Sequence, residues 1–274
     1  MTIMEKGRRK VWVLMLMGML LCQGCELFDV HPYDTHFSGE KDINRHNIER
    51  IRQAFTERDT LRVVFTGDTQ GWLDDTEDMV GDINKRADID FLIHLGDLTN
   101  YGETQEFVWQ RDLLNKLAVP YVCIIGNHDC LGNGEAVFRT MFGELNFSFI
   151  AGRVKFVCMN TNAMEYDYSN PVPDFNFMKR EWTADSTAFD RTVLCMHARP
   201  GTEQFNNNVE EPFRYYCDYF PRLMFCAAAH EHTPKVVDYY NNGTIYYVTP
   251  NVARRSYYLF TITPEGYSYE TIYF

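Results

Sequence analysis

The 274-residue sequence lacks the compositional extremes of fibrous and disordered chains. Its 17 glycines and 10 prolines are too few for a collagen-like or low-complexity chain. Hydrophobic residues make up 45% and charged residues 23%, a globular composition that excludes wholesale disorder. The sequence also has no internal repeat and no proline- or serine-rich linker after residue 60. Because the length corresponds to one large domain or two small ones, these absences favour one domain.

Positive charge is scarce, with 26 lysine and arginine residues against 38 aspartate and glutamate residues. The first 24 residues contain four of the basic side chains and one of the acidic ones, so the rest has 22 basic and 37 acidic side chains and a net charge of −15. Such a charge repels phosphate backbones unless metal ions or a local basic pocket intervene. We therefore do not expect nucleic acid as a general partner.

Hydrophobic runs long enough to span a bilayer are missing from the N-terminal region. The apolar run Val11–Leu21 has eleven residues and would rise only about 16 Å as a helix, roughly half of a hydrocarbon core. A transmembrane span is therefore disfavoured. The basic stretch Met1–Lys10 before this short apolar run predicts a secretory signal instead.

The residues after the apolar run resemble a bacterial lipoprotein signal. Residues 21–25 read LCQGC, and in that family the cysteine after a small residue is lipidated and becomes the mature N-terminus. The resemblance implies lipidation of Cys25 and an exported protein anchored to a bacterial membrane, facing the periplasm or the cell surface. An ordinary cleaved signal without lipidation is the alternative. The predicted organisation is a signal peptide at 1–24, a tether at 25–41 and a domain at 42–274.

The chain has no Cys-x-x-Cys pair after residue 25, so a zinc site built on thiolates is not expected. Six cysteines remain after the signal, and four of them lie in short apolar runs: Cys123, Cys158, Cys195 and Cys226. Buried free thiols that behave as small hydrophobic side chains are the simpler interpretation. An exported protein could also form one disulfide, for which Cys217 and Cys226 are the candidate pair.

The order of apolar runs predicts a parallel α/β core. Runs at 61–66, 90–95 and 120–125 are each followed by glycine and polar residues, and helical stretches lie near 76–86 and 103–117. Strand, loop and helix repeated in this order indicate a parallel sheet whose function lies at the carboxyl ends of its strands.

Two further segments flank this core. Before it, Asp42 is expected to cap a helix in which Ile43, Ile48, Ile51 and Phe55 fall near helical spacing. After residue 145 the sequence changes to a β-rich pattern, and nine of the 17 tyrosines lie in the last 36 residues, which is typical of half-exposed strands.

Five polar clusters follow one another along the chain, and four of them directly end an apolar run. Taken singly, a Gly-Asp pair is most often a turn, and a lone histidine at a strand end is more often a packed or surface group. Together they place three aspartates, four histidines and the asparagine Asn127 at one edge of a sheet. Oxygen and imidazole ligands in this mixture suit Zn, Mn or Fe, and a surplus beyond four ligands suggests two ions. The clusters are Gly67-Asp68-Thr69-Gln70, Gly96-Asp97-Leu98-Thr99-Asn100, Gly126-Asn127-His128-Asp129, Met196-His197-Ala198-Arg199-Pro200 and Ala229-His230-Glu231-His232.

In order and spacing, these clusters resemble the signature of the calcineurin-like metallophosphoesterases over about residues 62–235. That signature runs Asp-x-His, Gly-Asp, Gly-Asn-His-Asp/Glu, His and Gly-His-x-His. The gaps between the first three blocks are 29 and 30 residues here. Two positions depart from it: Gln70 stands where the family usually has histidine, and Ala229 replaces the usual glycine. The first change replaces an imidazole nitrogen by a neutral amide oxygen.

The resemblance implies two divalent metal ions, of Mn, Zn or Fe, and a role for each matching position. It implies a four-layer α/β/β/α sandwich, in which two mixed sheets are flanked by helices. A hydroxide between the ions is the expected nucleophile, because coordination lowers the pKa of water toward neutrality. His128 is the expected group that stabilises or protonates the leaving group, and Asp129 is expected to orient it. The implied ligands are Asp68, Gln70, Asp97 and His232 for one ion and Asp97, Asn127, His197 and His230 for the other, with Asp97 bridging both.

Two contacts with the substrate are expected from the residues themselves. Arg199 lies two residues after His197, and its guanidinium suits phosphate oxygens, although a solvated loop charge is an equal alternative. Asn100 lies in the loop after Asp97, where substrate contact and a structural role are equally open. His94, inside the second apolar run, is expected to pack in the core or to support a ligand rather than to bind metal.

The expected function is hydrolysis of a phosphoester substrate by an exported, lipid-anchored metalloenzyme. The alternative from another class is a surface lipoprotein that binds metal or ligand on the same scaffold, with weak or no turnover. Gln70 favours this alternative, whereas the other ligand positions and His128 favour the enzyme. A nuclease is a third possibility, which the net charge disfavours.

Overall fold

The computed structural model describes residues 12, 34–166 and 171–274. The lipidation site Cys25, the signal peptide apart from Trp12, and most of the tether lie outside the described residues, so their predicted roles stay predictions. Among the described residues, no helix combines the length and the apolar character needed to cross a membrane.

Two mixed β-sheets form the centre of the domain, as expected. In the first, β1, β2 and β3 are parallel, and the C-terminal strands β10 and β11 add an antiparallel edge next to β1. In the second, β5, β6, β7 and β9 are parallel, with β4 and β8 as antiparallel edges. The strand order in the first sheet is β11 (Tyr267–Tyr273), β10 (Ser256–Ile262), β1 (Leu61–Thr66), β2 (Phe91–His94), β3 (Tyr121–Cys123). The strand order in the second sheet is β4 (Phe147–Ala151), β5 (Val154–Met159), β6 (Arg191–Met196), β7 (Leu223–Ala228), β9 (Tyr246–Val248), β8 (Lys235–Val237).

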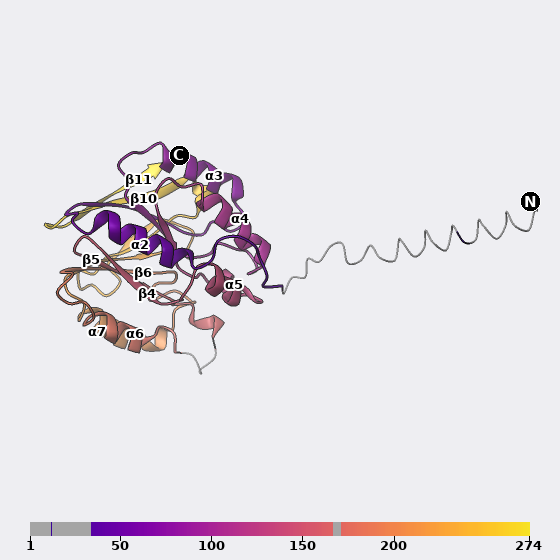
Figure 1. Cartoon of the computed structure of the whole chain (residues 1–274). Helices are drawn as coiled ribbons and strands as arrows, with labels where there is room; N and C mark the ends of the chain where they lie inside the picture. The colour runs from indigo at the N-terminus through magenta and orange to yellow at the C-terminus, as the bar shows by residue number, and fades with distance from the viewer. Residues whose placement is uncertain (1–11, 13–33, 167–170) are drawn as a thin grey trace, which may run out of the picture. The chain divides into compact units, whose positions relative to one another are not determined.

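Helices cover the outer face of each sheet and complete the four-layer sandwich (Figure 1). Because side chains alternate along a strand, Val63 of β1 packs between the sheets while Val64 packs outward against helices. The second sheet divides in the same way, with Phe156 in the inner core and Val157 in the outer one. The first sheet is covered by α3 (Leu73–Asn84), α4 (Thr104–Leu114) and α5 (Gly134–Met141), and the second by α6 (Phe175–Glu181) and α7 (Glu210–Cys217).

The first helix of the domain, α2 (Ile43–Phe55), contacts the edge strands β3 and β4 of both sheets. Its Asn44 side chain pairs with the edge of β3: Nδ2 donates to the Cys123 carbonyl and Oδ1 accepts from the Cys123 amide, both at 2.8 Å. An otherwise open sheet edge is thereby satisfied. Asp42 is the N-cap residue but makes no capping bond, contrary to expectation, because its backbone is left-handed (φ 52°) and its carboxylate accepts from Arg45 instead.

Residues 35–41, which we assigned to the tether, belong to the same compact unit as the rest of the domain, Thr35–Phe274. Phe37 packs against the core beneath the first sheet's helices. Arg111 of α4 lies 5.7 Å from the centre of the Phe37 ring and donates a 2.9 Å hydrogen bond to the Ser38 carbonyl. The compact unit therefore begins before residue 42.

All six cysteines of the domain are free thiols, which corrects the candidate disulfide between Cys217 and Cys226. Both residues are buried in the apolar core between the second sheet and its helices. Burial raises the pKa of each thiol above its ordinary value and keeps it protonated. These cysteines behave as small core side chains, the simpler of the two interpretations.

Candidate metal centre

The carboxyl ends of the parallel strands bring the predicted ligands together. Asp68 follows β1, Asp97 follows β2, His197 follows β6, and His230 and His232 follow β7. Candidate ligand atoms lie within 4.8 Å of one another in each of two groups: Asp97, His197 and His230, and Asp68, Asp97 and His232. Asp97 belongs to both groups, so the two form one continuous centre.

The backbone of this centre is held in a conformation that L-residues rarely adopt. Asp68, Asp97, His230 and His232 have φ angles of 53°, 60°, 70° and 58°. Residues in this region cost free energy and persist where the surrounding structure fixes them, as at ligand-binding sites. Gly126 permits the close approach, because a Cβ atom there would lie 2.1 Å from the Asp97 amide nitrogen. The glycine that begins the third cluster is therefore required by packing.

In the first group, the asparagine and histidine side chains converge on one point. Asn127 Oδ1 lies 3.0 Å from both His197 Nε2 and His230 Nδ1. His197 Nδ1 donates to the Leu95 carbonyl at 2.8 Å, so Nε2 is the ring nitrogen that faces the oxygens of Asn127 and Asp97. His230 Nε2 lies 2.9 Å from a Glu203 carboxylate oxygen and donates to it, which leaves Nδ1 as the ligand atom. Each histidine thus directs one ring nitrogen to the centre, where a bound ion would take the place of the nitrogen's proton.

In the second group, two buried oxygens have no hydrogen-bond partner: Asp68 Oδ2 and Gln70 Oε1. Buried oxygens without a partner are rare and need an explanation. A divalent cation would supply one, since carboxylate and amide oxygens coordinate such ions. Gln70 Nε2 lies 3.3 Å from Asp97 Oδ2 and 3.4 Å from His232 Nε2, so its amide group lies beside both side chains.

The buried carboxylates of the centre favour the binding of a cation. Burial, reinforced by the neighbouring Asp97, raises the pKa of Asp68 to about 8. Burial disfavours a charged His197, yet the carboxylates of Asp97 and Asp68 raise its pKa to about 9. Protons and cations compete for such a cluster, and metal binding displaces the protons. The donor set therefore fits divalent metal ions.

His128 lies beside the ligands without belonging to either group. Its backbone amide donates to Asp97 Oδ1 at 3.0 Å, which ties it to the shared carboxylate. Its Nδ1 donates to the Asn100 carbonyl at 2.8 Å, so Nε2 stays available to a substrate. This arrangement suits a residue that exchanges a proton with a leaving group.

Asp129 does not orient His128, contrary to expectation. Its Oδ2 accepts from the amides of Asp97 and Gly126, and its Oδ1 accepts from the amides of Leu98 and Thr99, all at 2.9 Å. The turn from His128 to Cys130 directs the carboxylate toward the loop after β2 and away from the His128 ring. Asp129 is therefore a positioning residue for the Asp97 loop.

Arg199 does not present a free guanidinium to phosphate, which corrects the expected contact. Its Nε donates to Glu231 at 2.7 Å and its Nη1 donates to the Pro200 carbonyl at 2.8 Å. Glu231 lies between His230 and His232, so the Arg199–Glu231 pair joins the loop after β6 to the loop after β7. The Asn100 side chain lines a small pocket next to Gly71, while its carbonyl holds His128.

Three supporting residues lie at the site beyond those we assigned to it. Glu203 fixes the His230 ring, and Arg254 donates from Nε to the His232 carbonyl at 2.8 Å. His94 is buried and accepts from the Gly96 amide at its Nδ1, while its Nε2 lies 3.0 Å from Thr69 Oγ1. Burial lowers the pKa of His94 to about 3, so the ring is neutral and supports the loops, as expected. Their position in the sequence did not indicate a role for Glu203 or Arg254 at the site, because their contacts join separate loops.

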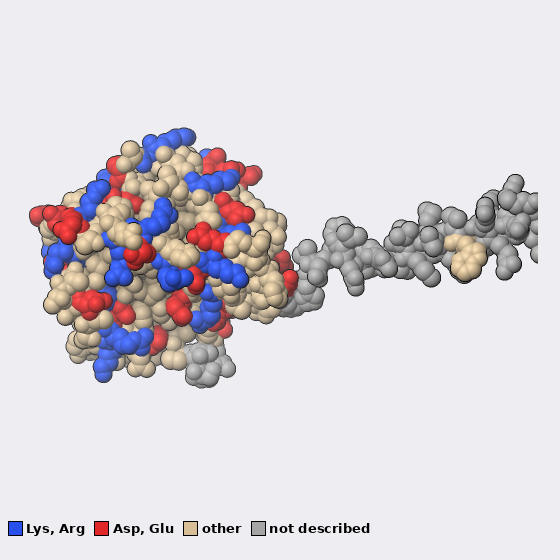
Figure 2. Space-filling view, viewed as in Figure 1, with Lys and Arg blue, Asp and Glu red and all other residues tan. Residues whose placement is uncertain are grey.

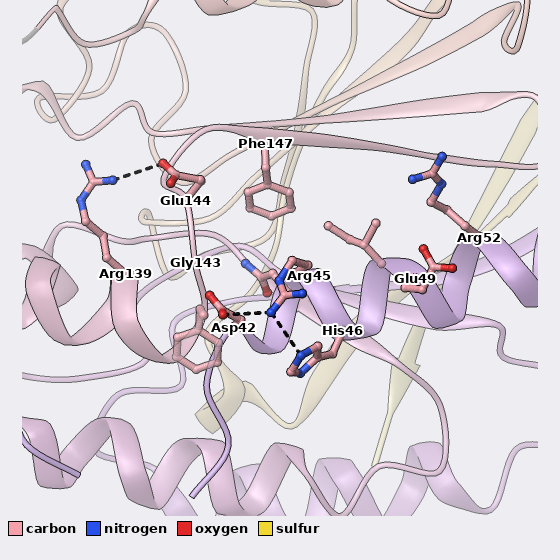
Figure 3. A pocket seen from close by; sticks show the side chains of 12 residues that line it. Asp42, Arg45, His46, Glu49, Arg52, Arg139, Gly143, Glu144 and Phe147 are labelled. Atoms are coloured by element: carbon pink, nitrogen blue, oxygen red, sulfur yellow. Dashed lines mark hydrogen bonds and ion pairs between the residues drawn. The ribbon is translucent and has the colours of Figure 1, made fainter. Parts of the chain in front are cut away.

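A larger groove, of about 610 Å³, runs along α2 and is distinct from this centre. Figure 3 shows Asp42 and Arg45 of the α2 region on one side and Arg139 and Glu144 on the other. These charges pair within each side, at 3.0 Å for Arg45–Asp42 and 3.4 Å for Arg139–Glu144. None of the residues that line the groove belongs to the two ligand groups.

One face of the molecule carries charges of both signs. On the face that Figure 2 shows, the described lysine and arginine side chains alternate with aspartate and glutamate and form no single continuous basic surface. The whole chain has a net charge of −12. A phosphate backbone would therefore meet no extended positive track on this face.

The comparisons with known proteins agree with this centre. The family model of the calcineurin-like phosphoesterases matches residues 61–234. A probable cyclic nucleotide phosphodiesterase of Xenorhabdus bovienii is 22% identical over 183 residues, which cover 62% of this chain and 71% of that protein.

Among solved structures, a dimetal phosphatase from Danio rerio shares the fold with a TM-score of 0.58 at 10% identity, over 78% of this chain and 98% of the other. The purple acid phosphatase PPD1 of yellow lupin (Lupinus luteus) has a TM-score of 0.57 at 17% identity. That match covers 74% of this chain, which spans about half (49%) of the lupin protein. GAP50, described as the anchor in the inner membrane complex of Plasmodium, has a TM-score of 0.56 at 10% identity, over 79% of this chain and 85% of that one.

The fold, the divalent-metal donor set and the family match over residues 61–234 agree, and the chain belongs to the calcineurin-like phosphoesterase family as a metal-dependent phosphoester hydrolase.

Proposed function

We propose that the enzyme works with a dinuclear centre in which Asp97 bridges two divalent ions. The observation that carries this proposal is the shared position of Asp97 in two groups of ligand atoms. Asn127, His197 and His230 would complete one ion's ligands, and Asp68, Gln70 and His232 the other's. When bound, such ions polarise the phosphoryl oxygens and supply a deprotonated water as nucleophile.

The protein's own residues would prepare the substrate for in-line displacement. His128 has Nδ1 fixed by the Asn100 carbonyl and Nε2 free, and in its doubly protonated form it would donate the Nε2 proton to the leaving oxygen. Asp129 holds the Asp97 loop through backbone amides. Arg199 and Glu231 keep the two histidine-bearing loops in register.

The substrate we propose is a phosphoester outside the cytoplasm. The name of the Xenorhabdus relative makes a cyclic nucleotide the first diester to test. The decisive assay is metal analysis of a fragment that starts at residue 26, followed by a panel of monoesters and diesters with Mn and Zn added separately. A fragment that binds two ions but turns over no phosphoester would contradict the proposal.

A binding protein with little turnover is the second candidate, because Gln70 replaces a histidine ligand. The same fold occurs in GAP50, described as an anchor, so the fold alone does not decide between the two. Turnover restored by added Mn would favour the enzyme, and inactivity with both sites filled would favour the binding protein.

We also propose that Cys25 is lipidated and that the enzyme is exported and membrane-anchored, on the basis of the signal-like residues 1–25. Cys25→Ala should move the protein from the membrane fraction to the soluble fraction, whereas Cys22→Ala should not. The opposite pattern would reassign the lipidated cysteine.

A further inference from the structure

A small pocket of about 160 Å³ lies between the loop after β1 and the start of α4. Gly71, Asn100, Glu106, Trp109 and Gln110 are among its lining residues. Gln110 Nε2 donates at 2.8 Å to the carbonyl of Thr69, the residue between Asp68 and Gln70. The Asn100 carbonyl holds His128 on the other side. The pocket therefore shares its walls with the loops that carry the metal ligands and the proton donor.

The pocket has one charged side chain, the carboxylate of Glu106, among polar and apolar lining residues. Gln110 is only 1% exposed, and because its Nε2 is engaged, its Oε1 is a buried acceptor without a partner. Glu106 adds a carboxylate whose oxygens accept from the amides of Asn100 and Tyr101. None of the residues that line the pocket is lysine or arginine. The negative charge of Glu106 therefore favours an entering group that carries positive charge.

The pocket also has an aromatic wall. The side chain of Trp109 is 49% exposed although α4 buries its opposite face against the domain. An indole beside a carboxylate attracts a cation, and tryptophan is the aromatic side chain that binds cations best. The volume corresponds to roughly five water molecules, at about 30 Å³ each, which is enough for a methylated or primary ammonium group.

We propose that this pocket is a subsite for a small ammonium group on the substrate's leaving side, which makes amino-alcohol phosphoesters the preferred substrate class. The inference rests on the proposed function, because it places the ammonium group beside the phosphoester held at the metal centre. Trp109 and Glu106 bind the positive charge. A neutral group of the same shape loses this charge interaction.

Binding without chemistry tests the subsite first. Choline and its neutral isostere 3,3-dimethylbutanol should be titrated into the metal-loaded full chain by NMR. Choline should bind about 10-fold more tightly, and Trp109→Leu should abolish the difference while Trp109→Phe keeps part of it. Tyr215→Leu, which removes another exposed aromatic side chain on α7, is the matched control and should change nothing. Equal binding of the two probes, or a preference that survives Trp109→Leu, would overturn the proposal.

Turnover then separates this inference from the proposed function. The ratio of kcat/KM for phosphocholine over 3,3-dimethylbutyl phosphate should be about 10 in the wild type and near 1 in Trp109→Leu. Equal hydrolysis of both esters would refute the subsite and leave the phosphoesterase intact. Choline binding that depends on Trp109, without hydrolysis of any ester, would support the subsite and refute the enzyme. Activity confined to glycerophosphocholine or to phosphatidylcholine vesicles would assign the ammonium group to a soluble ester or a lipid, and either supports the subsite.

Discussion

The two halves of the candidate metal centre differ in the hydrogen-bond partners and the exposure of their ligand side chains. In the half with His197 and His230, each imidazole has one nitrogen fixed by an acceptor, and Asn127 lies 3.0 Å from both rings. In the half with Gln70 and His232, two ligand oxygens are unpartnered and the His232 side chain is 40% exposed, against 0% for His197. Preorganised, desolvated ligands bind a metal more tightly than mobile, hydrated ones. We therefore expect the first half to hold its ion more firmly.

The largest loss of metal and activity is expected when the residue that both halves share is replaced. Asp97→Asn should empty both metal sites and lower activity by on the order of 10³-fold or more, because one carboxylate neutralises two dications. Metal content by mass spectrometry and phosphoester turnover measure the two effects.

Asp190→Asn is the control for that experiment, because Asp190 precedes β6 whereas His197 follows the same strand at its other end. Its carboxylate pairs with Arg153 and with the buried Arg191, and the neutral amide should leave the metals in place. An Asp97→Asn protein with two bound ions would refute the bridging role.

A variant outside both halves separates loss of metal from loss of chemistry. His128→Ala should keep both ions and lower the rate by roughly 10²–10⁴-fold, because its imidazole contacts the Asn100 carbonyl and neither ligand group. The loss should be smaller for a nitrophenyl ester, whose leaving group needs no proton. An equal loss for good and poor leaving groups would exclude His128 as the acid.

The sequence indicated the candidate ligands because most of them follow an apolar run, but its placement of all of them at one edge of a single sheet is wrong. Asp68 and Asp97 follow strands of the first sheet, whereas His197 and His230 follow strands of the second. Within each sheet, parallel strands place their carboxyl ends together, and the packing of the two sheets brings both sets of ends to one centre. The two-sheet layering came from the family resemblance, and the structure confirms it.

Contacts between loops could not be predicted in this way. Asp129 was placed beside His128 by its position in the chain, but the turn points its carboxylate at the amides of another loop. Glu203 lies 27 residues from His230, and only the folded loop after β6 brings it there. The same holds for Arg199, whose partner Glu231 lies on the next strand's loop. Side-chain direction within a loop depends on backbone angles that residue type alone does not fix.

A further variant tests the comparison by weakening metal binding in the half with His197 and His230. Glu203→Ala should weaken the ion held by His197 and His230 by about 10–100-fold, because the acceptor that fixes the His230 ring is lost. Glu203→Gln keeps an acceptor oxygen and should recover part of the affinity. Titration of the metal-free protein with Co²⁺, followed by absorption, measures this without turnover.

Glu165→Ala is the matched control for Glu203, since Glu165 accepts from Gln204 and contacts no ligand histidine. Its Co²⁺ titration should match that of the wild type. A Glu203→Ala titration with the wild-type affinity would show that the His230 ring needs no such support.

The smallest effect is expected from a variant that strengthens metal binding in the half with Gln70 and His232. Gln70→His replaces an amide oxygen by an imidazole nitrogen between Asp97 and His232, and should lower the free Mn²⁺ needed for half-maximal activity by about 10-fold. The wild type as purified should hold fewer than two ions, and the variant should retain more after dialysis. The maximal rate can change in either direction, because a more tightly held ion can also be a weaker Lewis acid. Two firmly bound ions in the wild type, together with an unchanged Mn²⁺ curve in the variant, would show that Gln70 is not a ligand. Its Nε2 would then act as a hydrogen-bond donor to Asp97, and the two halves would differ in exposure alone.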